Sequence, residues 1–106
     1  MNDGIAKKWL KQALPEILSE FNPQKVIVFG SRVQGKAHRE SDLDVIFISS
    51  YFQGVPFLKR MAMVLKRVRF PKHIDYLCCT EEEFEKLKHT SSILSDTMEN
   101  SIELAA

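Results

Sequence analysis

Three short, densely apolar segments limit the folds that this 106-residue chain can adopt. They are KVIVF (25–29), DLDVIFIS (42–49) and HIDYLCC (73–79). Each is rich in β-branched, aromatic or other apolar residues and has turn-forming or polar neighbours, which is typical of buried strands. Amphipathic segments with helical spacing lie between and around them. This alternation predicts one α/β domain over residues 1–106, with helices packed on a central sheet.

The helical segments have recognisable boundaries. The first extends from about Asp3 to Phe21 and contains Pro15, so we expect a kink or two short helices. The remaining helices are expected over Pro56–Arg69, Glu81–His89 and Ser91–Leu104. Thr80 and Glu83 have the spacing of a capping box, which favours a helix start immediately after Thr80.

The helix expected over residues 56–69 carries two kinds of side chain. Its apolar stripe, expected to pack on the sheet, consists of Phe57, Met61, Val64, Leu65 and Val68. Its basic face consists of Lys59, Arg60, Lys66 and Arg67. Such a face is either an ordinary solvated surface or a docking site for an acidic partner or for RNA.

The charges of the chain are unevenly distributed, although the net charge is only +1. No acidic residue lies between Asp44 and Asp75, whereas acidic residues predominate from Glu81 onward. A chain with this dipolar pattern is not expected to bind nucleic acid directly through its overall charge. A basic surface could still contact phosphates, and an acidic surface could contact a partner.

The sequence contains no sign of a membrane or secreted protein. No apolar run approaches the roughly 20 residues needed to span a bilayer, and the N-terminal segment lacks a signal-peptide core. A cytoplasmic location without membrane contact is therefore expected. Cys78 and Cys79 are adjacent and are expected to be reduced thiols on a partly buried strand.

Aspartates interrupt two of the apolar strands. Asp42 and Asp44 are separated by one residue, so their side chains project from the same face of a strand. Neighbouring carboxylates repel each other and resist burial unless a cation neutralises them. Asp75 lies within the third strand and would join them if the second and third strands are neighbours. Magnesium prefers such oxygen ligands, and three acids suit two ions about 4 Å apart.

Each feature alone has an ordinary explanation. An Asp-x-Asp pair commonly lies at a solvated strand edge, and Asp75 could pair with an arginine in the core. Gly30-Ser31 could be a simple turn, although a residue without Cβ at a strand end also lets a phosphate approach the backbone. Arg32 and Arg39 follow closely enough to counter the charge of a triphosphate.

Joined in order, these features resemble a known family. GSRVQGKAHRESDLDV (30–45), with Gly-Ser, ten residues and Asp-x-Asp, resembles the signature of the nucleotidyltransferase superfamily typified by DNA polymerase beta and kanamycin nucleotidyltransferase. It is most similar to the minimal nucleotidyltransferases, the MntA-like partners of HEPN proteins. HIDYL (73–77) resembles the later family strand that carries the third acid. The resemblance extends from Val26 to the terminal helix and implies a small mixed central sheet flanked by helices.

The resemblance also implies an activity and a site. The residues implied in catalysis and in binding two magnesium ions are Asp42, Asp44 and Asp75. The residues implied in binding the nucleotide phosphates are Gly30, Ser31, Arg32 and Arg39. The expected reaction moves a nucleoside monophosphate, AMP from ATP, to an acceptor hydroxyl and releases pyrophosphate. Asp75 is expected to help deprotonate that hydroxyl.

The acceptor is expected to come from a partner. Larger relatives carry a helical domain that binds the second substrate, and 106 residues leave no room for one. In minimal members the partner is commonly a HEPN toxin with ribonuclease activity, and the transferase acts as antitoxin by adding AMP to a toxin tyrosine. Homo- or hetero-oligomers are therefore expected. Two alternatives stay open: an antitoxin that acts by binding alone, and a small-molecule transferase completed by a partner chain.

Overall fold

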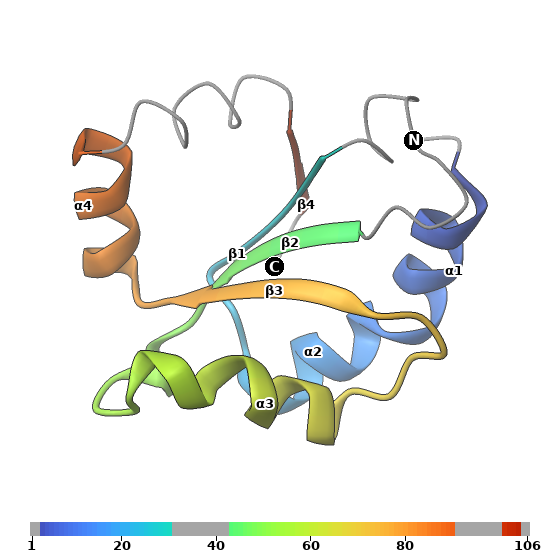
Figure 1. The fold of residues 1–106 in the computed structure, drawn as a ribbon, viewed down its shortest axis with the longest axis horizontal. Helices are drawn as coiled ribbons and strands as arrows, with labels where there is room; N and C mark the ends of the chain where they lie inside the picture. Colours follow the sequence, from blue (N-terminus) through green and yellow to red (C-terminus); the bar gives the residue numbers. More distant parts are fainter. Residues whose placement is uncertain (1–2, 31–42, 91–100, 105–106) are drawn as a thin grey trace.

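The computed structural model describes residues 3–30, 43–90 and 101–104, which form a mixed β-sheet packed with helices (Figure 1). The elements are α1 (Gly4–Gln12), α2 (Leu14–Phe21), β1 (Lys25–Phe29), β2 (Leu43–Ile48), the 3₁₀ helix η1 (Ser50–Phe52), α3 (Phe57–Arg67), β3 (Ile74–Cys79), α4 (Glu81–Thr90) and β4 (Ile102–Leu104). The three strands predicted from the sequence are confirmed, with boundaries that differ by one residue at most.

The sheet has the strand order β3-β2-β1-β4. β1 is antiparallel to both β2 and β4, whereas β2 and β3 are parallel. The predicted mixed sheet flanked by helices is therefore confirmed. Parallel strands need a crossover connection, and α3 supplies it between β2 and β3.

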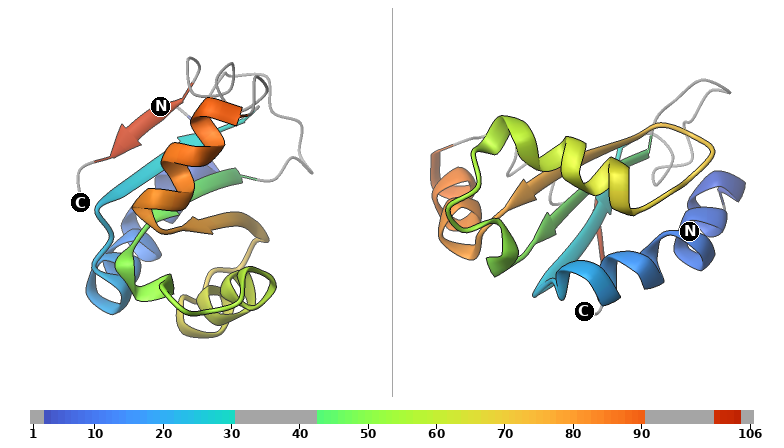
Figure 2. Two further views of the ribbon diagram at one scale, coloured as in Figure 1. Left: turned by 90° about the vertical axis from the view of Figure 1, so that its left-hand side faces the viewer. Right: turned by 90° about the horizontal axis from the view of Figure 1, so that it is seen from below.

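The two faces of the sheet are covered differently. On one face, residues of α1, α2 and α3 enclose the larger core, which includes Trp9, Ile17, Val45, Phe47 and Val64. On the other face, α4 contributes Phe84 to a smaller cluster with Ile27, Ile46, Ile48 and Cys79. Figure 1 and the right-hand view of Figure 2 place α4 and α1 at opposite ends of the strands. β2 and β3 both run toward α4 (Figure 1).

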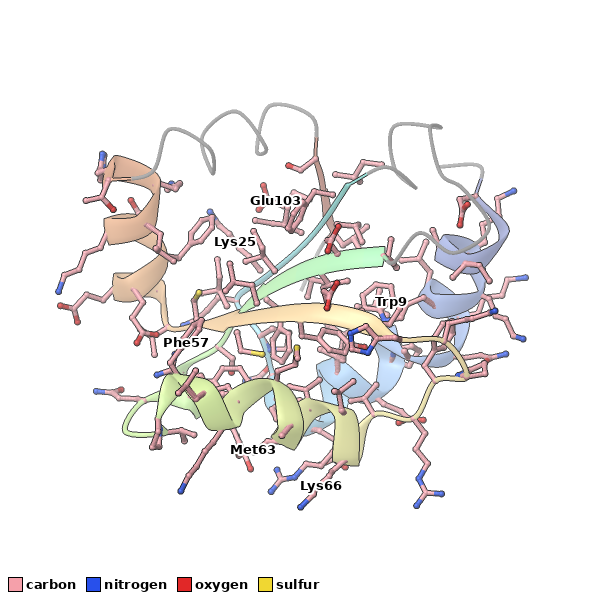
Figure 3. All side chains as sticks on the ribbon, viewed as in Figure 1. Trp9, Lys25, Phe57, Met63, Lys66 and Glu103 are labelled. Atoms are coloured by element: carbon pink, nitrogen blue, oxygen red, sulfur yellow. The ribbon has the colours of Figure 1, made fainter. Side chains whose placement is uncertain are left out.

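The N-terminal helical segment is divided into two helices, as Pro15 predicted. Asp3 caps α1 by accepting a hydrogen bond from the backbone N–H of Ala6, and Pro15 lies in the first turn of α2. Trp9 is fully buried between α1 and the sheet (Figure 3), and its indole N–H donates to the hydroxyl of Tyr76 at 2.9 Å. This bond satisfies both polar groups and ties α1 to β3.

The end of the chain differs from the sequence prediction. A helix was expected over Ser91–Leu104, but Ile102–Leu104 form β4, paired with β1. Ile102 and Leu104 pack against the larger core, whereas Glu103 between them is exposed. This alternation has the period of a strand, and the free edge of β1 satisfies its hydrogen bonds. Residues 91–100 of the predicted helix lie outside the described residues.

Fewer apolar side chains of α3 are buried against the rest of the fold than the sequence predicted. Val64 and Val68 are buried, but Phe57, Met61 and Leu65 of the expected apolar stripe remain 51%, 37% and 38% exposed. Leu58 is 92% exposed. Only one narrow side of α3 contacts the sheet, so most of the apolar residues on this helix face outward.

The sequence predicted that Arg60 belongs to the basic face of this helix, but the structure shows that it does not. Its side chain is buried, donates to the backbone carbonyls of Val55 and Cys78, and makes two hydrogen bonds to Glu83, at 2.5 and 3.1 Å. Glu83 also accepts from the backbone N–H of Thr80, which confirms the predicted capping box. The Arg60–Glu83 pair therefore joins α3, β3 and α4.

The cysteines are free and buried, as predicted. Burial raises the pKa of Cys78 to about 12 and that of Cys79 to about 11, so both thiols stay protonated and unreactive. None of the helices in the described part of the chain has the length and apolar composition of a membrane span.

The Arg60–Glu83 pair predicts a defined dependence of stability on pH. Hydrogen bonds from Arg60 are the main reason that the pKa of Glu83 falls from 4.5 to about 2. This carboxylate therefore stabilises the fold fully above pH 4.5, and the contribution is lost as the pH falls toward 2. Glu83→Gln should lower the free energy of unfolding at pH 7 by about 1 kcal/mol, since Glu83 is partly exposed.

The measurement is urea unfolding between pH 7 and pH 2.5. The difference between the wild type and Glu83→Gln should shrink as the pH falls below 4.5. Glu82→Gln is the matched control, because Glu82 is exposed and, among the described residues, pairs only with Lys86 one turn away on the same helix. A constant difference at all pH values would contradict the assignment.

Candidate active site

The sheet brings two of the three predicted acids together. In the parallel β2–β3 pair, Asp44 and Asp75 are register partners, and Asp44 is also the partner of Phe29 on β1. Register partners on neighbouring strands point to the same face, so the two carboxylates lie side by side on adjacent strands. Neither strand alone places them together; the pairing of β2 with β3 does.

Gly30 lies directly against this acid pair. It ends β1 with a φ of +98°, and a Cβ at this position would be 2.5 Å from Oδ2 of Asp44. An added Cβ would displace the carboxylate of Asp44, and the positive φ is one that residues with a Cβ rarely adopt. The absence of a Cβ at Gly30 therefore lets the carboxylate of Asp44 lie directly against its backbone.

The acids lie where the second face of the sheet is not covered by α4. Asp44 shares this face with Ile46 and Ile48, which pack against the α4 cluster farther along β2. Because β2 and β3 run toward α4, the acids near their beginnings lie at the opposite end (Figure 1). Both aspartates are only partly buried. A polar ligand can thus meet two carboxylates on a rigid, otherwise apolar sheet.

Asp75 has a partner different from the core arginine considered from the sequence. Its Oδ1 accepts a hydrogen bond from Nε2 of His73 at 2.9 Å. The buried arginine of the structure, Arg60, pairs instead with Glu83. His73 is not among the site residues predicted from the sequence, although its position two residues before Asp75 in an expected strand was the available signal.

Several predicted site residues lie outside the described residues: Ser31, Arg32, Arg39 and Asp42. Within residues 3–30, 43–90 and 101–104, no group of three or more His, Cys, Asp or Glu residues could hold a metal ion. The two described acids of the predicted triad, Asp44 and Asp75, are nevertheless suitable ligands for a divalent cation. They offer two hard carboxylates in register, and the carboxylate of Asp44 lies where a Cβ of residue 30 would be.

The sequence matches the model of the nucleotidyltransferase domain family over residues 8–103. The chain belongs to this family. The match spans every described strand and helix except the beginning of α1 and the last residue of β4.

A solved structure supports the same nucleotidyltransferase fold. It is a predicted nucleotidyltransferase from Sulfolobus solfataricus with 29% sequence identity and a TM-score of 0.54. The similarity covers 77% of this chain and 69% of the other. A search of curated proteins finds no match.

A second surface of interest lies on α3. We define the α3 apolar surface as Phe57, Leu58, Met61 and Leu65, which are exposed and share one side of the helix by their spacing. Lys59 and Lys66 are exposed on the same helix. Figure 3 shows Phe57 near its beginning and Lys66 near its end. Exposed apolar patches of this kind mark interaction sites in soluble proteins.

The close approach of Gly30 to Asp44 predicts the effect of adding one methyl group. Gly30→Ala should lower the free energy of unfolding by about 1–3 kcal/mol, because it adds both an unfavourable φ and a clash with the carboxylate. Gly54→Ala is the matched control: its φ is +80°, but nothing lies within 4 Å of the added Cβ.

Both variants can be measured by urea unfolding under one set of conditions. Gly54→Ala should cost about 1 kcal/mol through its backbone alone. Equal losses for the two variants would show that the contact between position 30 and Asp44 contributes nothing beyond the backbone conformation.

Proposed function

We propose that this nucleotidyltransferase moves AMP from ATP to a tyrosine hydroxyl on a helical HEPN-type toxin and thereby acts as its antitoxin. The observation that carries the catalytic part is the in-register pairing of Asp44 with Asp75 beside Gly30. Because the substrates are ATP and an intracellular toxin, we place the reaction in the cytoplasm.

The proposed roles of the acids follow from their chemistry. Asp44 and Asp75, with Asp42, would hold magnesium, which neutralises the charge of the triphosphate when it is bound. Gly30 and Ser31 would receive the β- and γ-phosphates, with Arg32 and Arg39 near them. Gly30 supports this role because it has no Cβ beside the acid pair, and a Cβ would block the approach of a phosphate to the backbone.

The proposed reaction is a substitution at the α-phosphorus of ATP. The tyrosine oxygen forms a bond to this phosphorus, and the bond from phosphorus to the α–β bridging oxygen breaks. Pyrophosphate leaves with that electron pair, and AMP stays attached to the tyrosine. The proton of the hydroxyl passes to the carboxylate of Asp75, which lies on the exposed part of the sheet face.

The proposed partner is supported by the α3 apolar surface. Its four side chains face outward, and the exposed cations Lys59 and Lys66 accompany them. Two copies packed through α3 would bring like charges together, because the sequence has no acid between Asp44 and Asp75. A helical protein that presents apolar residues edged with carboxylates fits this surface better.

The catalytic proposal predicts that both described acids are required for transfer. Asp44→Asn and Asp75→Asn should each reduce AMP transfer by about 100-fold or more, since each removes a charge at the reacting centre. The assay combines the chain, a HEPN-type toxin, labelled ATP and magnesium, followed by mass spectrometry of the toxin. Glu82→Gln, a change on exposed α4, is the control that should keep full activity.

The same variants separate the proposed function from its alternatives. An antitoxin that acts by binding alone would neutralise the toxin equally well with Asp44→Asn and would leave no AMP on it. Label on a small molecule rather than on the toxin would indicate the third function. Complete transfer by Asp75→Asn would rule out the role given to this residue.

The α3 apolar surface gives a separate prediction for complex formation. Leu58→Ser should weaken binding to the HEPN protein about tenfold, because truncating a buried interface anchor commonly costs 1 kcal/mol or more. It should leave the melting temperature unchanged, since Leu58 is 92% exposed in the free chain. Isothermal titration calorimetry at several salt concentrations is the measurement.

Lys11→Ser, an exposed change on α1, serves as the control. The double variant Lys59→Glu and Lys66→Glu should weaken binding most at low salt, where charges are least screened. Wild-type affinity for Leu58→Ser would move the docking site away from α3.

A further inference from the structure

The pairing of His73 with Asp75 is not explained by the packing of the fold. Nε2 of His73 lies 2.9 Å from Oδ1 of Asp75, yet the two side chains are 51% and 48% exposed. Exposed pairs contribute little to stability, and solvent could satisfy both groups without this contact. His73 immediately precedes β3, so a separation of two residues places both side chains on one face of the strand.

The contact restrains the acid that the proposed reaction depends on. Asp75 makes no other hydrogen bond to a described residue. A carboxylate with one oxygen held by an imidazole N–H keeps a fixed plane, and its second oxygen remains available for a ligand. Carboxylates that bind metals are commonly held in this way by neighbouring hydrogen-bond donors, which reduces the ordering that binding requires.

We propose that His73 is a positioning residue, which orients the carboxylate of Asp75 for a divalent cation bound with Asp44. This inference rests on the proposed function. In this proposal His73 acts through its hydrogen bond to Asp75 and not through a change in its charge. His73 contacts neither the nucleotide nor the acceptor in this proposal, and it acts only through Asp75.

The test is titration of the full chain with Mn²⁺ and a non-hydrolysable ATP analogue, with free Mn²⁺ measured by electron paramagnetic resonance. His73→Ala should weaken Mn²⁺ binding about tenfold or more, the usual effect of losing such a partner. His73→Gln, which keeps an N–H donor of similar reach, should recover most of the affinity. His89→Ala is the matched control, because His89 lies 3.9 Å from Glu85 on exposed α4.

Thermal unfolding of the same variants separates positioning from folding. His73→Ala should leave the melting temperature close to that of the wild type, since the pair is half exposed. Wild-type Mn²⁺ affinity in His73→Ala would overturn the inference. Equal weakening in His73→Ala and His73→Gln would overturn it as well, because the hydrogen bond would then not be the cause.

Failure of the proposed function would look different. If the wild type and Asp75→Asn bound Mn²⁺ equally weakly, the acids would not form a cation site, whatever His73 does. If the wild type bound Mn²⁺ and Asp75→Asn did not, the site would stand, and the result for His73→Ala would decide the inference alone.

Discussion

The parallel pairing of β2 with β3 is the constraint on which the site depends. It fixes Asp44 opposite Asp75, and no feature of either strand alone could do so. Parallel pairing requires a crossover, and α3 provides it while packing Val64 into the larger core. Arg60 of α3 then reaches β3 and Glu83 of α4. The helices therefore hold the acids indirectly, by holding the register of the strands that carry them.

The unequal covering of the sheet explains how such a small fold can keep carboxylates accessible. The face toward α1, α2 and α3 is closed by Trp9, Phe21 and Phe47 among others. On the other face α4 covers only the far ends of β2 and β3, where Phe84 packs. Among the described residues, the packing lies on one face and at one end of the other face, and Asp44 and Asp75 lie at the remaining end. Functional residues in sheet proteins commonly lie at such strand ends, outside the packed core.

Much of this arrangement could be predicted from the sequence, because its signals were local. The apolar runs predicted β1, β2 and β3, Pro15 predicted the divided N-terminal helix, and Thr80 with Glu83 predicted the beginning of α4. The errors arose where tertiary contacts decide. Ile102–Leu104 form a strand because they pair with the free edge of β1. Arg60 can be buried because Glu83, on α4, supplies a carboxylate that pairs with its charge. Strand periodicity could have predicted that His73 and Asp75 share one face of the strand, but it could not have predicted the hydrogen bond between them.

We propose that Asp44 and Asp75 together bind a divalent cation at the end of the sheet beside Gly30. The most direct measurement is a crystal structure with Mn²⁺ and a non-hydrolysable ATP analogue, with the metal located by its anomalous scattering. We expect an anomalous peak within coordination distance of both carboxylates. A peak elsewhere with the nucleotide, or ordered nucleotide phosphates remote from Asp44 and Asp75, would contradict it.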